Sequence, residues 1–160
     1  MAGHLVLVQG TGVRIPVPEP KNMSIIDKVK KLNLPSGQYI VYGSGILEAL
    51  GFRESRDVDI SVTKKLHQLL RESGEWREEI RYGKIFLKKN GIEINSQLDW
   101  DEYQTTTAEA IKTAKNVNGI PFLNIFETIK FKKALGRKKD LSDIKLLEQY
   151  LTKNENLRDA

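Results

Sequence analysis

The sequence predicts an α+β domain in which a small mixed β-sheet is flanked by helices and followed by a helical C-terminal part. Apolar residues recur at helical spacing in several segments, and short β-branched runs lie between them. The resulting order is helix, strand, helix, strand, helix, hairpin and then helices. With 160 residues, the chain is long enough to bury a core within one domain of ordinary size.

The first half of the domain alternates helices with strands. Ser24 is a suitable N-cap for a helix that ends before the Pro-Ser-Gly break at residues 35–37. Residues 39–42 are β-branched or aromatic, which predicts a buried strand. Gly43-Ser44-Gly45 then predicts a tight turn into a short helix that ends near Gly51.

Residues 57–62 predict a second strand, because apolar and polar residues alternate strictly along them. Asp57, Asp59 and Ser61 then share one face of the strand. The three apolar residues between and after them share the other face. We therefore expect the apolar side chains to enter the core and both aspartates to stand together outside it.

The second half is predicted to contain a hairpin and further helices. Thr63 can cap a helix through residue 72, on which His67 is expected to lie at the surface. Asn90-Gly91 between two short strand-like runs is a signal for a type I′ hairpin. The remaining expected elements are strands at 76–82, 84–88 and 92–96 and helices at 105–115, 124–135 and 141–151.

Residues 1–22 are expected to be an extension to a main domain at residues 23–153, which a tail at residues 154–160 follows. One interpretation of the extension is an edge strand, a turn at residues 10–12 and a linker with three prolines. Another is that Met23 is the true start, because Val-Arg-Ile at residues 13–15 can be encoded by a sequence resembling the T-loop of a transfer RNA gene. Both interpretations stay open at this point.

The composition limits the kinds of site that the chain can form. It has no cysteine and two histidines, which argues against disulfides, thiolate metal sites and His-rich zinc sites. Any metal is expected to have oxygen ligands, which Mg²⁺ and Mn²⁺ prefer. A net charge of +5 and a pI near 9.3 fit a polyanionic partner such as nucleic acid, and equally a solvated basic surface. No apolar run approaches the roughly 20 residues of a membrane-spanning helix, so we expect no membrane contact and a cytoplasmic location.

The segment from the first strand to the second contains the residues with chemical potential. Asp57 and Asp59 on one strand face repel each other unless a cation lies between them. Gly43-Ser44 precedes a helix, where backbone N–H groups and a hydroxyl can hold a phosphate. Each feature alone also fits a plain turn or a capped strand end. Their combination in this order predicts a site for Mg²⁺ (or Mn²⁺) and a nucleotide.

This arrangement resembles the nucleotidyltransferase superfamily with the DNA polymerase β-like fold, especially its minimal and type IV toxin–antitoxin members. The first motif of that family is a Gly-Ser or Gly-Gly turn, a helix, and then Asp-x-Asp or Asp-x-Glu on the next strand. Here the motif corresponds to Gly43-Ser44 and Asp57-Val58-Asp59. The Arg- and Ser-containing loop before Asp57 also looks like the loops of this family.

The C-terminal part carries a second resemblance to the family. Residues 130–144 are similar to its signature of lysine, alanine, arginine and a Lys-Asp pair that precedes a further aspartate. Asp140 and Asp143 in this run are expected to cap the last helix and complement its dipole. Together the two motifs extend the resemblance over residues 37–150.

The resemblance implies a third carboxylate on a strand beside the Asp-x-Asp strand. Glu93 in the hairpin is the candidate, and Asp99 just beyond the strand is the alternative. Glu93 is equally well explained as a solvent-facing strand residue. In the family's mechanism Asp57 and Asp59 would bridge two metal ions, and the third carboxylate would complete the second metal site.

The resemblance also implies contacts to the nucleotide. Ser44 and the backbone at Gly43 would hold the β and γ phosphates. Two arginines of the following loop are placed to face the nucleotide, and three basic residues near the C-terminus recur at i, i+3 and i+7, as on one helix face. That face would bind phosphates or an RNA backbone, or would be a solvated basic surface. These further candidates are Arg53, Arg56, Lys130, Lys133 and Arg137.

The predicted function is a metal-dependent nucleotidyltransferase that transfers NMP from an NTP to an acceptor hydroxyl of RNA, a protein or a small molecule. The basic pI favours RNA. A second hypothesis is a catalytically degenerate nucleotide-binding module that pairs with a toxin or antitoxin partner. A third is a structural domain in which the acidic pair only caps a strand.

Overall fold

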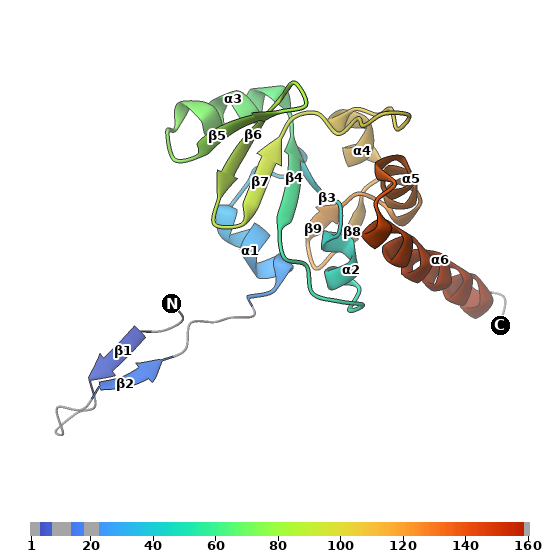
Figure 1. Cartoon of the computed structure of the whole chain (residues 1–160), viewed down its shortest axis with the longest axis horizontal. Helices are drawn as coiled ribbons and strands as arrows, with labels where there is room; N and C mark the ends of the chain where they lie inside the picture. The colour runs from blue at the N-terminus through green and yellow to red at the C-terminus, as the bar shows by residue number, and fades with distance from the viewer. Residues whose placement is uncertain (1–3, 8–13, 18–22, 159–160) are drawn as a thin grey trace.

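The computed structural model describes residues 4–7, 14–17 and 23–158, and these residues form a two-stranded sheet and a seven-stranded mixed sheet with flanking helices (Figure 1). The predicted α+β class with a mixed sheet is confirmed. The turn expected at residues 10–12 and residues 18–20 of the expected linker lie outside the described residues. The strands are β1 (His4–Leu7), β2 (Arg14–Val17), β3 (Tyr39–Tyr42), β4 (Val58–Val62), β5 (Arg77–Arg81), β6 (Lys84–Lys89), β7 (Ile92–Asn95), β8 (Lys115–Val117) and β9 (Ile120–Phe122). The helices are α1 (Ile25–Leu32), α2 (Gly45–Ala49), α3 (Lys64–Glu72), α4 (Thr107–Lys112), α5 (Ile125–Leu135) and α6 (Lys138–Arg158).

The large sheet has the strand order β5-β6-β7-β4-β3-β9-β8. The pairs β4–β7 and β3–β9 are parallel, and the other pairs are antiparallel. The predicted hairpin at Asn90-Gly91 is confirmed, with φ of +49° and +78° at its two turn residues. The sheet is larger than expected because Asn118-Gly119, with φ of +50° and +86°, forms a second turn of the same sequence between β8 and β9.

The alternation on β4 separates two apolar clusters, one on each face of the sheet. Val58, Ile60 and Val62 are fully buried in the larger cluster, as predicted, together with side chains of α1, α2, α3, α5 and α6. Ile40 and Tyr42 of β3 point to the other face and pack with α4 and α5. Asp59 of β4 therefore lies on the same face of the sheet as Tyr42. Helices α4 and α5 cover only part of this face.

Polar side chains cap the N-termini of several helices. Ser24 and Thr63 accept hydrogen bonds from the backbone N–H three residues later, as predicted for α1 and α3. His67 on α3 was expected at the surface, and that expectation is wrong. It is buried, with Nε2 3.1 Å from the backbone oxygen of Ile85, because α3 packs over β6 on this side. Burial lowers the pKa of its imidazole.

The two C-terminal helices are separated by a short break. Gly136, with φ of +63°, ends α5, and Arg137 lies in the connection before α6. Arg137 therefore does not continue a helix face from Lys130 and Lys133, which corrects the i, i+3, i+7 prediction. Helix α6 continues through Arg158, past residue 153. Among the described residues, none of the helices combines the length and the apolar character needed to cross a membrane.

Candidate metal and nucleotide site

Two of the carboxylates predicted from the sequence, Asp59 and Glu93, lie side by side at the centre of the large sheet. Asp59 on β4 is paired in register with Glu93 on the neighbouring parallel strand β7. Paired residues of neighbouring strands point to the same face, with strands about 4.8 Å apart. Asp57 lies in the bend directly before β4 and is exposed. Of the two candidates for a third carboxylate, the structure places Glu93 beside Asp59, whereas Asp99 lies beyond the end of β7.

The electrostatics of Asp59 reflect this arrangement. Partial burial, the negative charges of Glu93 and Asp57, and a side-chain hydrogen bond with Glu93 raise the pKa of Asp59 to about 7. The positive charge of Arg137 lowers this pKa and only partly offsets the other effects. Asp59 thus lies among like charges. Its oxygen donors suit a hard divalent cation such as Mg²⁺.

Glu93 is also bound to basic side chains of the neighbouring strands. Its carboxylate contacts the Nη2 of Arg81 and lies 3.5 Å from the Nζ of Lys88. In the part of the chain that the structure describes, no three acidic or histidine side chains stand ready to hold a metal ion. Both basic side chains contact the Oε1 of Glu93, so they would compete with a metal ion for this oxygen.

The glycine of the Gly43-Ser44 turn is required by its distance from Asp59. Gly43 has a φ of +74°, and a Cβ atom on it would lie 2.9 Å from the Oδ2 of Asp59. Such a distance is shorter than real Cβ contacts, so any other residue would displace the carboxylate. The turn from β3 into α2 therefore passes directly over Asp59. The glycine turn and the aspartate pair of the motif are therefore in direct contact in the structure.

Ser44 is bound by a lysine that the sequence interpretation missed. The Nζ of Lys132 on α5 donates to the Oγ of Ser44 at 3.1 Å and to the Oδ2 of Asp143 at 2.9 Å. It also lies 3.5 Å from the Oδ1 of Asp140. Only 1% of the Lys132 side chain is exposed. We call Lys132, Asp140, Asp143 and Ser44 the buried lysine cluster.

Asp140 and Asp143 have a larger role than the helix capping expected from the sequence. Asp140 does accept from the backbone N–H of Arg137, but both carboxylates are buried and paired with cations. Arg53 donates to Asp143 from Nε at 2.9 Å and from Nη2 at 2.7 Å. Arg137 donates in the same two-pronged way to Asp140. These hydrogen bonds connect the loop before Asp57, helix α5 and helix α6 to the Gly43-Ser44 turn.

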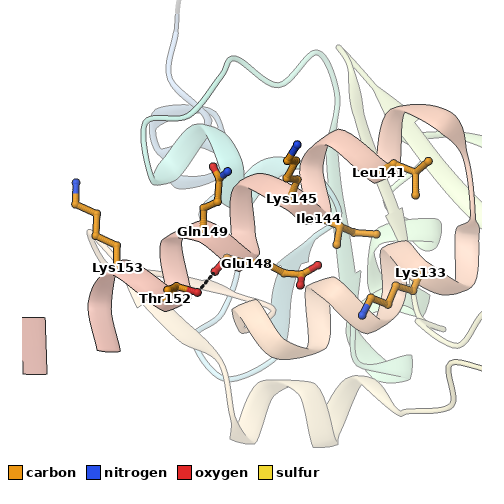
Figure 2. A pocket seen from close by; sticks show the side chains of 8 residues that line it. All are labelled: Lys133, Leu141, Ile144, Lys145, Glu148, Gln149, Thr152 and Lys153. Atoms are coloured by element: carbon orange, nitrogen blue, oxygen red, sulfur yellow. Dashed lines mark hydrogen bonds between the residues drawn. The ribbon is translucent and has the colours of Figure 1, made fainter. Parts of the chain in front are cut away.

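The predicted basic residues lie in different places around this centre. Arg56 is exposed in the bend before β4. Lys130 is exposed on α5 and pairs with Glu127 at 3.0 Å. Lys133 lines a shallow groove of about 770 Å³ between α5 and α6, together with side chains of α6 such as Ile144 and Glu148 (Figure 2). Of the five predicted basic residues, Arg53 and Arg137 are therefore the ones bound to the buried lysine cluster.

Comparisons of the chain with family models, with curated proteins and with solved structures found no match. Two adjacent carboxylates, a glycine turn packed on one of them and a cluster of cations nearby are suited to binding a metal ion and an anionic ligand.

Proposed function

We propose that this protein is a Mg²⁺-dependent nucleotidyltransferase that transfers NMP from an NTP to an acceptor hydroxyl. The observation that carries the proposal is the pairing of Glu93 with Asp59 across the parallel strands β4 and β7, beneath the Gly43 turn. The sequence motif alone did not determine which residue is the third carboxylate. The register supports Glu93, next to the two aspartates of the motif.

In this proposal, Asp57, Asp59 and Glu93 hold the metal ions. When bound, Mg²⁺ neutralises the phosphate charges and orients the attacking and leaving oxygens. The chain itself has to place the triphosphate beside these carboxylates. Gly43 lets the backbone of the turn approach the carboxylate of Asp59 closely, because a Cβ atom at this position would lie 2.9 Å from its Oδ2.

The cations beside the carboxylates support binding of the triphosphate. Arg137 is close enough to Asp59 to lower its pKa, and its guanidinium is half exposed. A planar guanidinium suits phosphate oxygens. Lys132 and Arg53 act differently, because their contacts hold the Ser44 turn and the loop before Asp57 in place. We therefore assign Arg137 to phosphate binding and Lys132 and Arg53 to positioning.

The test is transfer of labelled nucleotide. The protein is incubated with Mg²⁺, each α-labelled NTP, and either total RNA or total protein as acceptor. We expect label to be transferred and an Asp57→Asn/Asp59→Asn variant to lose about a hundredfold or more of the rate. Asp27→Asn on α1 is the matched control, because it removes a carboxylate far along the chain from the motif. Equal transfer by the wild type and the double variant would contradict the proposal.

The ion pairs of Glu93 with Arg81 and Lys88 favour one second candidate. If these pairs persist with nucleotide bound, the protein is a nucleotide-binding module without transferase activity. Metal-dependent NTP binding measured by calorimetry, without transfer to any acceptor, would support this alternative.

A further inference from the structure

A row of paired polar residues crosses five strands of the large sheet. It starts at the β5–β6 hairpin and passes through the carboxylates to β3. Because neighbouring strands lie about 4.8 Å apart, the basic end of the row lies about 10–14 Å from Asp59. The paired residues are Arg77 on β5, Lys88 on β6, Glu93 on β7, Asp59 on β4 and Tyr42 on β3.

The two halves of this sheet face differ in what covers them. Over β3 the face packs against α4 and α5 through the smaller apolar cluster. Over β5, β6 and β7 this face carries partly exposed charged side chains around the buried Phe86, and a groove of about 460 Å³ opens beside them. The charged residues lining this groove are Arg77, Arg81, Lys88, Lys89, Asp57 and Glu93.

The basic groove, as we call it, is lined by more basic than acidic side chains. Four basic and two acidic side chains line it, which leaves a net charge of +2. Glu79 pairs with Arg81 at 3.2 Å and with Lys88 at 3.0 Å, and Glu75 pairs with Lys89 at 3.9 Å, which brings the local balance to zero while Glu93 is ionised. Glu93 on β7 also forms ion pairs with Arg81 and Lys88. Neutralising Glu93 therefore frees Arg81 and Lys88 for another anion.

The location of the groove indicates what this anion is. The Gly43 turn, where the proposed triphosphate sits, lies on the β3 side of Asp59. The basic groove lies on the opposite side, beyond Glu93. The second substrate of a transfer reaction approaches from that opposite side. Arginine side chains suit phosphate oxygens, and a row of cations suits a chain of regularly spaced phosphates.

We propose that the basic groove binds the phosphodiester backbone of a single-stranded nucleic acid and directs its terminal hydroxyl to the carboxylates. The acceptor role rests on the proposed function. In that role the hydroxyl oxygen forms a bond to the α-phosphorus of the NTP, and the bond from that phosphorus to the bridging oxygen breaks. Pyrophosphate leaves, and the hydroxyl proton passes to solvent.

The test is binding of a short fluorescein-labelled single strand, followed by fluorescence anisotropy at several salt concentrations. RNA and DNA of the same sequence form the two arms. Arg77→Ala/Lys88→Ala is expected to weaken binding about tenfold. The slope of log K against log salt should decrease by about 1.4, since two phosphate contacts are lost. Circular dichroism and thermal unfolding confirm that the variant is folded.

A matched control removes the same charge from the opposite side of the sheet. Lys64 and Lys65 are exposed on α3, whose Leu66 packs into the larger cluster. Lys64→Ala/Lys65→Ala should change affinity by less than about twofold, as expected for scattered surface charges. If this control loses as much affinity as Arg77→Ala/Lys88→Ala, binding is nonspecific and the inference is overturned.

Glu93→Gln tests the release of the groove cations without using enzyme activity. In EDTA this variant should bind the strand several-fold more tightly than the wild type, because Arg81 and Lys88 lose an anionic partner. Glu72→Gln on α3 removes one charge elsewhere and should match the wild type. Unchanged affinity in Glu93→Gln would overturn the assignment of these two cations.

The outcomes separate this inference from the proposed function. Groove-dependent binding without nucleotide transfer would support the groove as a nucleic-acid site and contradict the transferase. Transfer to protein, with no binding of either strand, would support the transferase and overturn the groove assignment. Tighter binding of RNA than of DNA identifies the 2′-hydroxyl as a recognised group, and equal binding identifies the shared backbone.

Discussion

Replacing Lys132 with methionine is expected to destabilise the protein by about 3 kcal/mol, because it removes the cation that two buried carboxylates share. Asp140 and Asp143 have side-chain exposures of 1% and 3%. Breaking a buried ion pair from one side costs about 3–5 kcal/mol. The lower end applies here, since each carboxylate keeps an arginine partner that is partly exposed. Methionine retains most of the apolar stem, so the cost comes mainly from charge.

The assay is urea unfolding followed by circular dichroism, with Lys133→Met as the matched control. Lys133 is the next residue on α5 and is exposed. For a chain of this size, 3 kcal/mol corresponds to a decrease in Tm of roughly 6–12 °C. The control should shift the free energy of unfolding by less than about 0.5 kcal/mol.

A double variant tests the electrostatic origin of this effect. Lys132→Met/Asp143→Asn removes one charge of each sign and should be less destabilised than the sum of its two single variants. Strict additivity, or a cost of Lys132→Met no greater than that of Lys133→Met, would refute the reasoning from buried charge.

Three further predictions concern the carboxylates and the core. Gly43→Ala should lower the free energy of unfolding more than Gly37→Ala does, and it should weaken Mg²⁺ binding. Both glycines have positive φ, but only the Cβ at position 43 would meet Asp59. Equal losses of stability in the two variants would contradict the close contact. The pKa of Asp59 in the folded protein, about 7, lies above its value of about 4 in the unfolded chain. In the absence of metal, the contribution of Asp59 to the free energy of unfolding is therefore present below pH ~4 and lost as the pH rises to ~7. The affinity for Mg²⁺ should increase over the same pH range. Calorimetry across this range should show neither pH effect for Asp59→Asn. Phe122→Ala should cost about 3–5 kcal/mol in urea unfolding, because this residue is fully buried where β9 pairs with β3, and a cost below 1 kcal/mol would show that β9 is not part of the core.

Several elements were predictable because their signals are local. The N-caps Ser24 and Thr63 need only their own side chain and the following turn. The alternation on β4 follows from the geometry of one strand. Asn118-Gly119 carries the same local turn signal as Asn90-Gly91, so the turn between β8 and β9 was equally predictable from the sequence.

Lys132 could have been recognised from its position on α5. It lies seven residues after Ile125 and three after Ile129, both of which are buried on the same helix. A lysine on an apolar helix face has to find an anion, because an unpaired buried charge is costly. The sequence offers two aspartates on the next helix, but it does not show which carboxylate reaches the lysine. That depends on how α5 and α6 pack.

The sequence by itself determined the α+β class, the positions of most elements and the presence of two aspartates beside a glycine turn, because each depends on residues close together in the chain. The tertiary structure decided that Glu93 is the carboxylate beside Asp59, since strand register is a long-range property. It also decided that Arg53 and Lys132 meet at Asp143, and that a basic groove continues outward from Glu93. Residues far apart in the chain come together only through the packing of sheet and helices, and these contacts define the candidate site.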